Sequence, residues 1–258
     1  MTMNKALLRV YSQVYKNFRL LFENPFRFMD VTFWPLILLF SLTLFVSYFG
    51  QDPKILVLVV LGVMGWRAVY HANMEIASNY MEEYWSQSLT HLFITPIRPL
   101  ELVLGSAVSG LFKFLLVFAM YYLVTFFLYG FVIPDPLVFA IACVFLFLFG
   151  LSLGMIVQGV MFFYASEAFS LSFTVPDVFV LLSAAYYPLS VLPQPVQAFS
   201  LLLPSTHAFL LIKSTLGLAT VDYGALVGLS VVWFAIGYAV MMFAFSRAKK
   251  TGRLVRVA

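Results

Sequence analysis

Charge, cysteine and histidine are scarce in this sequence of 258 residues. Charged residues make up 10% of it and hydrophobic residues 63%, whereas a soluble domain carries about 25% charged residues. This scarcity of charge excludes an ordinary water-soluble domain. The one cysteine, Cys143, lies within an apolar run, which excludes a disulfide framework. The three histidines (His71, His91 and His207) have no ligand spacing with cysteine or carboxylate, so no metal site is predicted.

Long apolar runs are what the sequence has instead. A helix of roughly 18 to 20 apolar residues crosses the hydrocarbon of a bilayer. The predicted spans are residues 31–49, 54–74, 102–131, 137–163, 171–189 and 224–246. We therefore predict an all-α membrane protein with six transmembrane helices, in a single domain over residues 1–258. The first strongly apolar run starts near Val31, too far along the chain for a cleaved signal peptide.

Lysine and arginine are divided unevenly between the two predicted sides of the membrane. One side holds eleven of them: Lys5, Arg9, Lys16, Arg19, Arg27, Arg98, Arg247, Lys249, Lys250, Arg253 and Arg256. The other side holds two, Lys54 and Lys213. Because cytoplasmic loops carry the excess of basic residues, we predict a multi-pass protein of the plasma or inner membrane with both termini cytoplasmic. The net charge of +4 is assigned to this topology and not to nucleic-acid binding.

Residues 1–23 have the pattern of an amphipathic helix at the membrane interface. Apolar residues repeat at helical spacing from Leu7 to Phe22. The other face holds Lys5, Arg9, Gln13, Lys16 and Arg19. We expect this helix to lie in the membrane surface with its basic face toward anionic headgroups, and a soluble amphipathic helix is the alternative. Asn24 and Pro25 are predicted to cap and begin the next helix.

The stretch "GSAVSGLF", residues 105–112, comes close to a phosphate-binding loop. It has the two glycines of that motif. However, Leu111 and Phe112 stand where a lysine and a serine or threonine would hold phosphate and magnesium. We therefore predict that this chain does not bind ATP in that way.

The stretch "GLSLG", residues 150–154, matches the motif around a nucleophilic serine at Ser152. That motif requires a strand-to-helix turn, but here it falls within a predicted span. We interpret Gly150 and Gly154 as a close helix–helix contact. An intramembrane serine protease that uses Ser152 and His207 remains as the alternative. No catalytic residue is assigned to the chain in the main interpretation.

Polar and charged side chains inside the spans need a structural or functional reason. The predicted intramembrane charges are Arg67, Lys113 and Asp177. Arg67, His71 and Glu75 are four residues apart and therefore share one face of a helix. Asn79 and Glu82 continue that face toward the cytoplasm.

Two of these charges are cations at similar predicted depth, Arg67 and Lys113. Either Asp177 or Glu75 could neutralise one of them in an ion pair between helices. The alternative is that the cations extend toward the cytoplasmic headgroups. Acidic residues are sparse in the spans, so we see no reason to prefer a proton relay.

Residues 75–101 form the longest predicted cytoplasmic segment. Its middle, from Glu82 to Phe93, can form a short helix with an apolar edge that includes Leu89. The sequence "TPIRP" then ends the helix. A short helix closed by prolines is suited to contact a cytosolic partner, and a solvated loop is the alternative.

The stretch "YYPLSVLPQPVQAFSLLLPSTHAF", residues 186–209, has four prolines within seventeen residues. Pro188 and Pro193 are expected to end the fifth span. Pro195 and Pro204 are each expected to lie in the first turn of a short helix. Irregular backbone at membrane depth is tolerated only where protein or a water-filled cavity covers it.

Together these residues resemble the membrane subunit of type-2 ABC exporters, over essentially the whole chain. The resemblance rests on the N-terminal helix followed by "NPFRFMDVTFWPLILL", on "MEEYWSQSLTHLFITPIRPLELVLG", on the short turn "YASEAF", and on "PLSVLP" followed by "LLPSTH". Lys213 stands where the family usually has arginine.

The resemblance implies specific roles for some residues. Residues 75–101 would be a cytoplasmic coupling segment, and residues 188–216 a re-entrant helical segment on the extracellular side. The residues implied to contact an ATPase are Glu82, Glu83, Trp85, Gln87, Leu89, Phe93, Ser166 and Glu167. Those implied to form an outer gate are Tyr186, Tyr187, Pro188, Pro193, Pro204 and His207.

The resemblance also implies partners. This chain would be the permease, forming the substrate path with a second copy or a related permease among membrane lipids. A separate cytosolic ABC ATPase would bind ATP and Mg²⁺, so this chain would hold no cofactor and would not be an enzyme. We expect a lipid or hydrophobic small molecule as substrate, or a lipid-linked glycan. An ion-coupled secondary transporter is the alternative function.

Overall fold

The protein is described here by a computed structural model, which covers residues 5–49, 53–89 and 97–251. It is 86% helical, and the described residues contain no strand. The long helices are α1 (Lys5–Glu23), α2 (Pro25–Phe49), α3 (Pro53–Trp85), α5 (Pro99–Tyr129), α6 (Pro136–Tyr164) and α10 (Tyr223–Lys250). The shorter elements are η1 (Ala165–Ser170), α7 (Leu171–Leu182), η2 (Leu189–Val191), α8 (Gln194–Ser200) and α9 (Pro204–Ser214).

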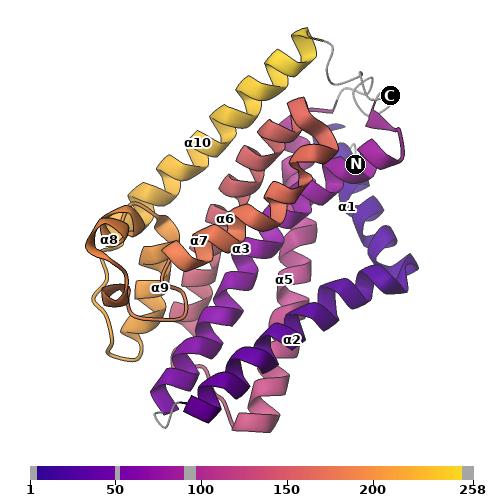
Figure 1. The fold of residues 1–258 in the computed structure, drawn as a ribbon. Helices are drawn as coiled ribbons and strands as arrows, with labels where there is room; N and C mark the ends of the chain where they lie inside the picture. Colours follow the sequence, from indigo (N-terminus) through magenta and orange to yellow (C-terminus); the bar gives the residue numbers. More distant parts are fainter. Residues whose placement is uncertain (1–4, 50–52, 90–96, 252–258) are drawn as a thin grey trace.

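Helix α3 is the centre of the bundle (Figure 1). In the most apolar 18-residue stretch of α3, 78% of the stretch is buried, whereas the corresponding stretches of α2, α5 and α10 are each 22% buried. Helix α6 packs on α3 at Gly150, where an added Cβ would lie 2.4 Å from the Val69 carbonyl oxygen. The glycines of "GLSLG" therefore serve close helix packing, as we interpreted them.

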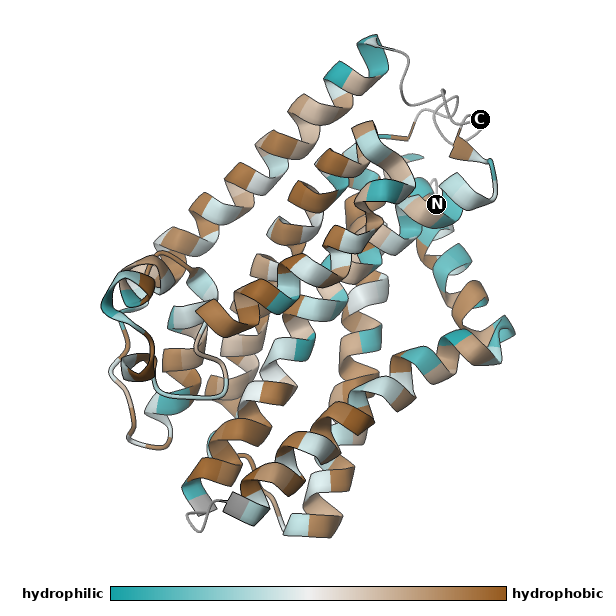
Figure 2. Cartoon of the chain, viewed as in Figure 1, coloured by the Kyte–Doolittle hydropathy of each residue, from teal (hydrophilic) through white to brown (hydrophobic). Residues whose placement is uncertain are grey.

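The outward surfaces of the bundle are apolar. Figure 2 shows hydrophobic residues along α5 and α10, and their exposed side chains include Leu115, Phe127 and Val231. Five helical stretches of the described chain are long and apolar enough to cross a membrane, and α8 with α9 would make a sixth if counted as one span. The chain is thus an all-helical, apolar-rich bundle of the kind found in multi-pass membrane proteins.

The fifth predicted span is shorter than expected. We predicted helix over 171–189, but α7 ends at Leu182, six residues before Pro188. The helix ends because Ala184 takes a left-handed conformation with φ of 49°. The prolines therefore do not end this helix, although Pro195 and Pro204 do lie in the first turns of α8 and α9 as predicted. Helices α8 and α9 meet at a bend of 94°.

The end of α3 also differs from the prediction. The helix continues beyond residue 74 to Trp85, so Glu82 and Glu83 belong to α3 and do not begin a separate short helix. A turn at Ser86 and Gln87 follows, where Gln87 has φ of 56°. Leu89 is buried just after it, whereas Phe93 lies outside the described residues.

Helix α1 is amphipathic, as predicted, but two residues of its basic face turn toward the bundle together with Asn17 and Leu21. Arg9 and Lys16 point inward to form ion pairs with the carboxylates of α5 and α3. The apolar side chains of α1 are divided: Leu7, Tyr11 and Phe22 are about 60% exposed, whereas Leu21 is buried. The expectation that these two basic residues face headgroups is therefore wrong.

Candidate substrate cavity and coupling end

A cavity of about 590 Å³ lies between α2 and α3, with α1, α5 and α7 contributing single residues or pairs. Its charged lining residues are Arg27, Asp30, Arg67, Glu75, Glu82 and Lys113. We call it the polar cavity. The face of α3 predicted from the four-residue spacing lines it from Arg67 through His71 and Glu75 to Glu82. The structure thus brings these residues together within one cavity.

A buried ion pair crosses the polar cavity. Lys113 Nζ on α5 lies 2.5 Å from Glu75 Oε2 on α3, and the side chains are 19% and 5% exposed. Of the two acids that could have neutralised a cation, Glu75 is the one used. Asp177 is exposed on α7 and has no ion pair with a described residue.

Arg67 lies in the same cavity without an ion pair among the described residues. It is 9% exposed, and its guanidinium lies 5.2 Å from the centre of the Tyr70 ring. Its Nε has no hydrogen-bond partner in the described chain, and neither does Nε2 of His71. A buried donor without a partner lowers the stability of the folded state. Arg67 therefore differs from Lys113 and Lys213, two other cations inside the bundle, which are paired or hydrogen-bonded.

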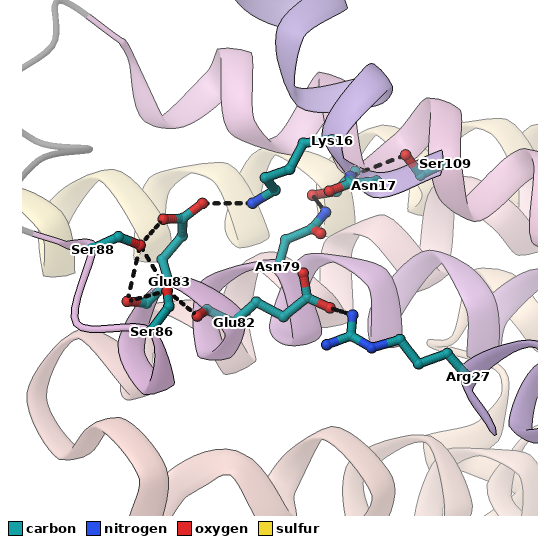
Figure 3. Close-up of polar contacts among 10 residues, drawn as sticks. Lys16, Asn17, Arg27, Asn79, Glu82, Glu83, Ser86, Ser88 and Ser109 are labelled. Atoms are coloured by element: carbon teal, nitrogen blue, oxygen red, sulfur yellow. Dashed lines mark hydrogen bonds and ion pairs between the residues drawn. The ribbon is translucent and has the colours of Figure 1, made fainter. Parts of the chain in front are cut away.

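The end of α3 beside the cavity carries the acids predicted to couple to an ATPase. Figure 3 shows that both are held by the same chain: Arg27 of α2 pairs with Glu82, and Lys16 of α1 pairs with Glu83 at 2.5 Å. Asn79 donates to Ser106 on α5 at 2.6 Å. The acids therefore hold α1 and α2 against α3.

A second part of the predicted coupling surface lies next to this end. The ring of Trp85 on α3 packs edge-on against Phe169 of η1, with centroids 5.4 Å apart. Ser166 and Glu167 of η1 are exposed, and so are Trp85 and Gln87. Residues from two separate stretches of sequence thus meet at one end of the bundle, and their side chains remain largely exposed.

The start of α5 is fastened to α1 by a two-point ion pair. Arg9 Nε and Nη2 donate to the two carboxylate oxygens of Glu101 at 2.7 and 2.6 Å. This hydrogen bonding raises the pKa of Arg9 above its usual range. The charged end therefore consists of ion pairs that join α1, α2, α3 and α5.

The opposite end of the bundle holds the predicted gate residues. The turn after α7 lies against α3, where an added Cβ at Gly62 would be 2.4 Å from the Ala185 carbonyl oxygen and 3.0 Å from the Tyr186 ring. Tyr187 donates to the Leu181 carbonyl. Pro188 and Pro193 are exposed, whereas Pro204 is buried. The structure thus places the two tyrosines at the turn and the prolines on either side of α8.

Lys213 on α9 fastens that turn. It is 3% exposed, and its ammonium donates to the carbonyls of Ala184 and Tyr187 at 2.5 and 2.6 Å. The sequence analysis identified Lys213 as a basic residue on the predicted outer side and as the position where the resembled family usually has arginine, but it assigned this residue no partner. A proline-rich stretch that must leave carbonyls unpaired is the signal that could have assigned it this role.

The serine and histidine of the protease alternative do not pair with each other. Ser152 donates to the Leu148 carbonyl at 2.9 Å in the middle of α6. Nε2 of His207 lies 2.9 Å from the Leu201 carbonyl oxygen. Each side chain satisfies a nearby backbone group, which leaves no nucleophile–base pair. "GSAVSGLF" likewise lies within α5 and forms no loop.

Sequence reasoning missed several residues of the polar cavity, including Asp30 and the three that follow. Trp34 of α2 and Phe173 of α7 line it with exposed rings. Asn17 of α1 also lines it and donates to Ser109 at 3.0 Å. Asn17 is a buried polar residue on an amphipathic helix, which was a usable signal, whereas exposed aromatic residues in spans are too common to be informative.

A comparison of the chain with protein-family models finds no match, and a search among curated proteins finds no similar protein either.

Proposed function

We propose that this chain is the permease subunit of an ATP-driven exporter, working with a separate cytosolic ATPase and with a second copy or a related permease. The substrate would cross the membrane beside the polar cavity, between α2 and α3. ATP binding and hydrolysis by the partner would move the charged end of the bundle.

The observation that carries this proposal is the continuity of α3. This one helix holds the exposed Trp85, the cavity residues Arg67, His71 and Glu75, and Gly62 against the turn near Tyr186. At 1.5 Å per residue, Arg67 and Trp85 are about 27 Å apart along it. A helix of this length, buried on most sides, transmits a displacement at Trp85 to the cavity wall and to the turn.

The charge distribution favours an external energy source over ion coupling. A proton- or sodium-coupled transporter needs a carboxylate in the path that can release its ion. Here Glu75 is paired with Lys113 and Glu82 with Arg27, while Asp30 is exposed. Each described acid of the polar cavity is therefore either paired within the chain or open to the exterior.

The proposed orientation puts the charged end in the cytoplasm. Helix α1 and the Lys250 end of α10 lie at the same end of the bundle (Figure 1), as both termini would in a chain with an even number of spans. The bent pair α8–α9 would then dip into the outer leaflet as a re-entrant segment, covered by α6 and by Trp233 of α10, which donates to the Leu202 carbonyl. Tyr186, Tyr187 and His207 would border the exit.

The experiment that tests the function is reconstitution of the full-length chain with and without its ATPase. The chain alone is expected to hydrolyse no ATP, and the complex purified from native membranes is expected to hydrolyse ATP and export substrate in vesicles. Hydrolysis by the chain alone, or ATP-independent export driven by an ion gradient, would contradict the proposal.

Charge reversal at Glu167 tests the coupling surface without disturbing the fold. Glu167 is exposed and has no ion pair with a described residue, unlike Glu82 and Glu83, whose reversal would also break internal pairs. Glu167→Lys is expected to lower recovery of the ATPase, because a like-charge contact in an interface costs several kcal/mol. Gln194→Lys, an exposed change at the opposite end, is the matched control and should leave recovery unchanged.

A further inference from the structure

Four buried polar atoms that line the polar cavity lack a partner among the described residues. Asn17 Oδ1 and Glu82 Oε2 are acceptors, and Glu82 already forms an ion pair with Arg27 through its other oxygen. The other two, on Arg67 and His71 of α3, are a donor and a group that can act as a donor. Arg67 Nε carries a proton at all accessible pH values, and His71 Nε2 carries one in the matching tautomer. Both residues are more than nine-tenths buried, at 9% and 5% exposed, and both line the cavity. Neither atom has a hydrogen-bond partner among the described residues. Two donors on one helix face, one turn apart, can converge on a single acceptor.

When the ion pairs of the cavity are accounted for, one buried cation has no anionic partner among the described residues. Lys113 is neutralised by Glu75, and Arg27 by Glu82. Arg67 and Asp30 remain, and Asp30 is exposed on α2 and forms no ion pair with Arg67. A guanidinium buried among apolar helices is stabilised by an anion, and its planar fork matches a phosphate or carboxylate group. The cavity thus has an unmet preference for a negative charge at Arg67.

The rest of the lining suits the apolar part of an amphiphile. Trp34 and Val31 of α2 and Phe173 of α7 form part of the wall, and the two rings are 65% and 41% exposed at its edge. Arg67 lies about 21 Å along α3 from its start, which is well inside the thickness of a bilayer's hydrocarbon. An anion bound there is in reach of lipid tails that lie along α2 and α7.

We infer that the polar cavity binds the phosphate headgroup of an anionic membrane amphiphile, held by the guanidinium of Arg67 and by Nε2 of His71, with its chains against Trp34 and Phe173. The inference rests on the proposed function in one respect only, which is that the bound amphiphile is also the transported substrate. Binding requires no ATPase, so failure to bind and failure to transport are separate results.

The test is a binding titration of the full-length chain in neutral detergent, followed by native mass spectrometry. The probes are dioleoylphosphatidylglycerol, the zwitterionic dioleoylphosphatidylcholine, and inorganic phosphate. The wild-type chain is expected to bind one phosphatidylglycerol at least tenfold more tightly than phosphatidylcholine. Arg67→Gln is expected to weaken phosphatidylglycerol binding about tenfold or more, because it removes a charge-assisted hydrogen bond. His71→Phe is expected to weaken it by a smaller factor.

Two variants sharpen the result. Arg19→Gln removes an exposed cation outside the cavity and should leave the affinity unchanged. Asp30→Asn removes the one described carboxylate of the cavity that forms no ion pair, and should tighten phosphatidylglycerol binding. If Arg67→Gln does not fold, the wild-type preference between the two lipids and the Asp30→Asn change still decide the matter. Equal binding of both lipids, or an affinity unaffected by Arg67→Gln and Asp30→Asn, would overturn the inference. If inorganic phosphate at equal concentration displaces phosphatidylglycerol, the ligand is a soluble anion, and the assignment of an amphiphile is overturned.

Discussion

The two ends of the helical bundle are held together by different chemistry. At the charged end, ion pairs join α1, α2, α3 and α5, as in Arg9–Glu101 and Lys16–Glu83. At the proline-rich end, side chains donate to backbone carbonyls. These bonds run from Lys213 to Ala184 and Tyr187, from Gln197 to Leu192, and from Trp233 to Leu202.

The difference follows from the backbone at each end. At the charged end, long helices carry acidic and basic side chains that pair with one another, and among the described bonds of the turn after α3 only Ser86 and Ser88 donate to carbonyls at the end of that helix. At the other end, turns and prolines break the helices and leave carbonyls without a backbone donor. Buried carbonyls must be paired, so side-chain donors take that role. We therefore expect the ion pairs of the charged end to be able to exchange partners when the helices move. At the proline-rich end, the side-chain donors are needed for the backbone to fold.

The largest effect is expected between the two ends, at the buried pair of the polar cavity. Glu75→Gln leaves the ammonium of Lys113 without its counter-ion, at a site where the side chains are 5% and 19% exposed. Breaking a buried pair in this way is expected to lower the free energy of unfolding by about 3–5 kcal/mol. The measurement is denaturant or thermal unfolding in detergent. The double variant Glu75→Gln with Lys113→Gln should recover most of the loss, and a loss that simply adds would contradict the pairing.

The next largest effect is expected at the proline-rich end. Lys213→Met leaves the carbonyls of Ala184 and Tyr187 without their donor, and the residue is 3% exposed. We expect the free energy of unfolding to fall by about 2–4 kcal/mol. Lys213→Arg keeps a donor, so its free energy of unfolding should fall by less. Lys249→Met is an exposed change in α10 and should have no measurable effect on the free energy of unfolding. Unfolding curves of the three variants that coincide with the wild type would remove the proposed difference between the ends.

The sequence was informative where the signal is local. Pro195 and Pro204 begin helices because proline suits a first turn, and the four-residue spacing of Arg67, His71 and Glu75 placed them on one face. It was uninformative for the end of α7, because Ala184 is an ordinary residue held in a left-handed conformation by its surroundings.

Long-range pairing was the other part that the sequence could not supply. Lys16 and Glu83 are 67 positions apart, and Arg9 and Glu101 are 92 apart. An amphipathic pattern shows that a helix has a basic face but does not show whether that face meets lipid headgroups or carboxylates of the same chain. The sequence pattern therefore predicted the N-terminal helix correctly, but the prediction that Arg9 and Lys16 face lipid headgroups was wrong.

The smallest effect is expected at the charged end. Lys16 is 30% exposed in its pair with Glu83, and such pairs contribute roughly 0–1 kcal/mol. Lys16→Gln should therefore change the free energy of unfolding by less than about 1 kcal/mol. The same variant should change the rate of ATP hydrolysis in the proposed complex with an ATPase if this end exchanges partners during the proposed transport cycle. An unfolding loss as large as that of Lys213→Met would show that the charged end is a fixed structural joint.

The most direct test of the central claim, that α3 moves as one rigid helix, is a pair of spin-label distances in the proposed complex with an ATPase. In a Cys143→Ser background, one label pair at Ile55 and Tyr84 spans α3, about 44 Å apart by helix rise. A second pair at Trp34 and Phe173 crosses the edge of the polar cavity. On addition of a non-hydrolysable ATP analogue, the account predicts that the α3 distance stays the same while the distance across the cavity changes. A shortened or broadened α3 distance, or a cavity distance that does not respond, would contradict it.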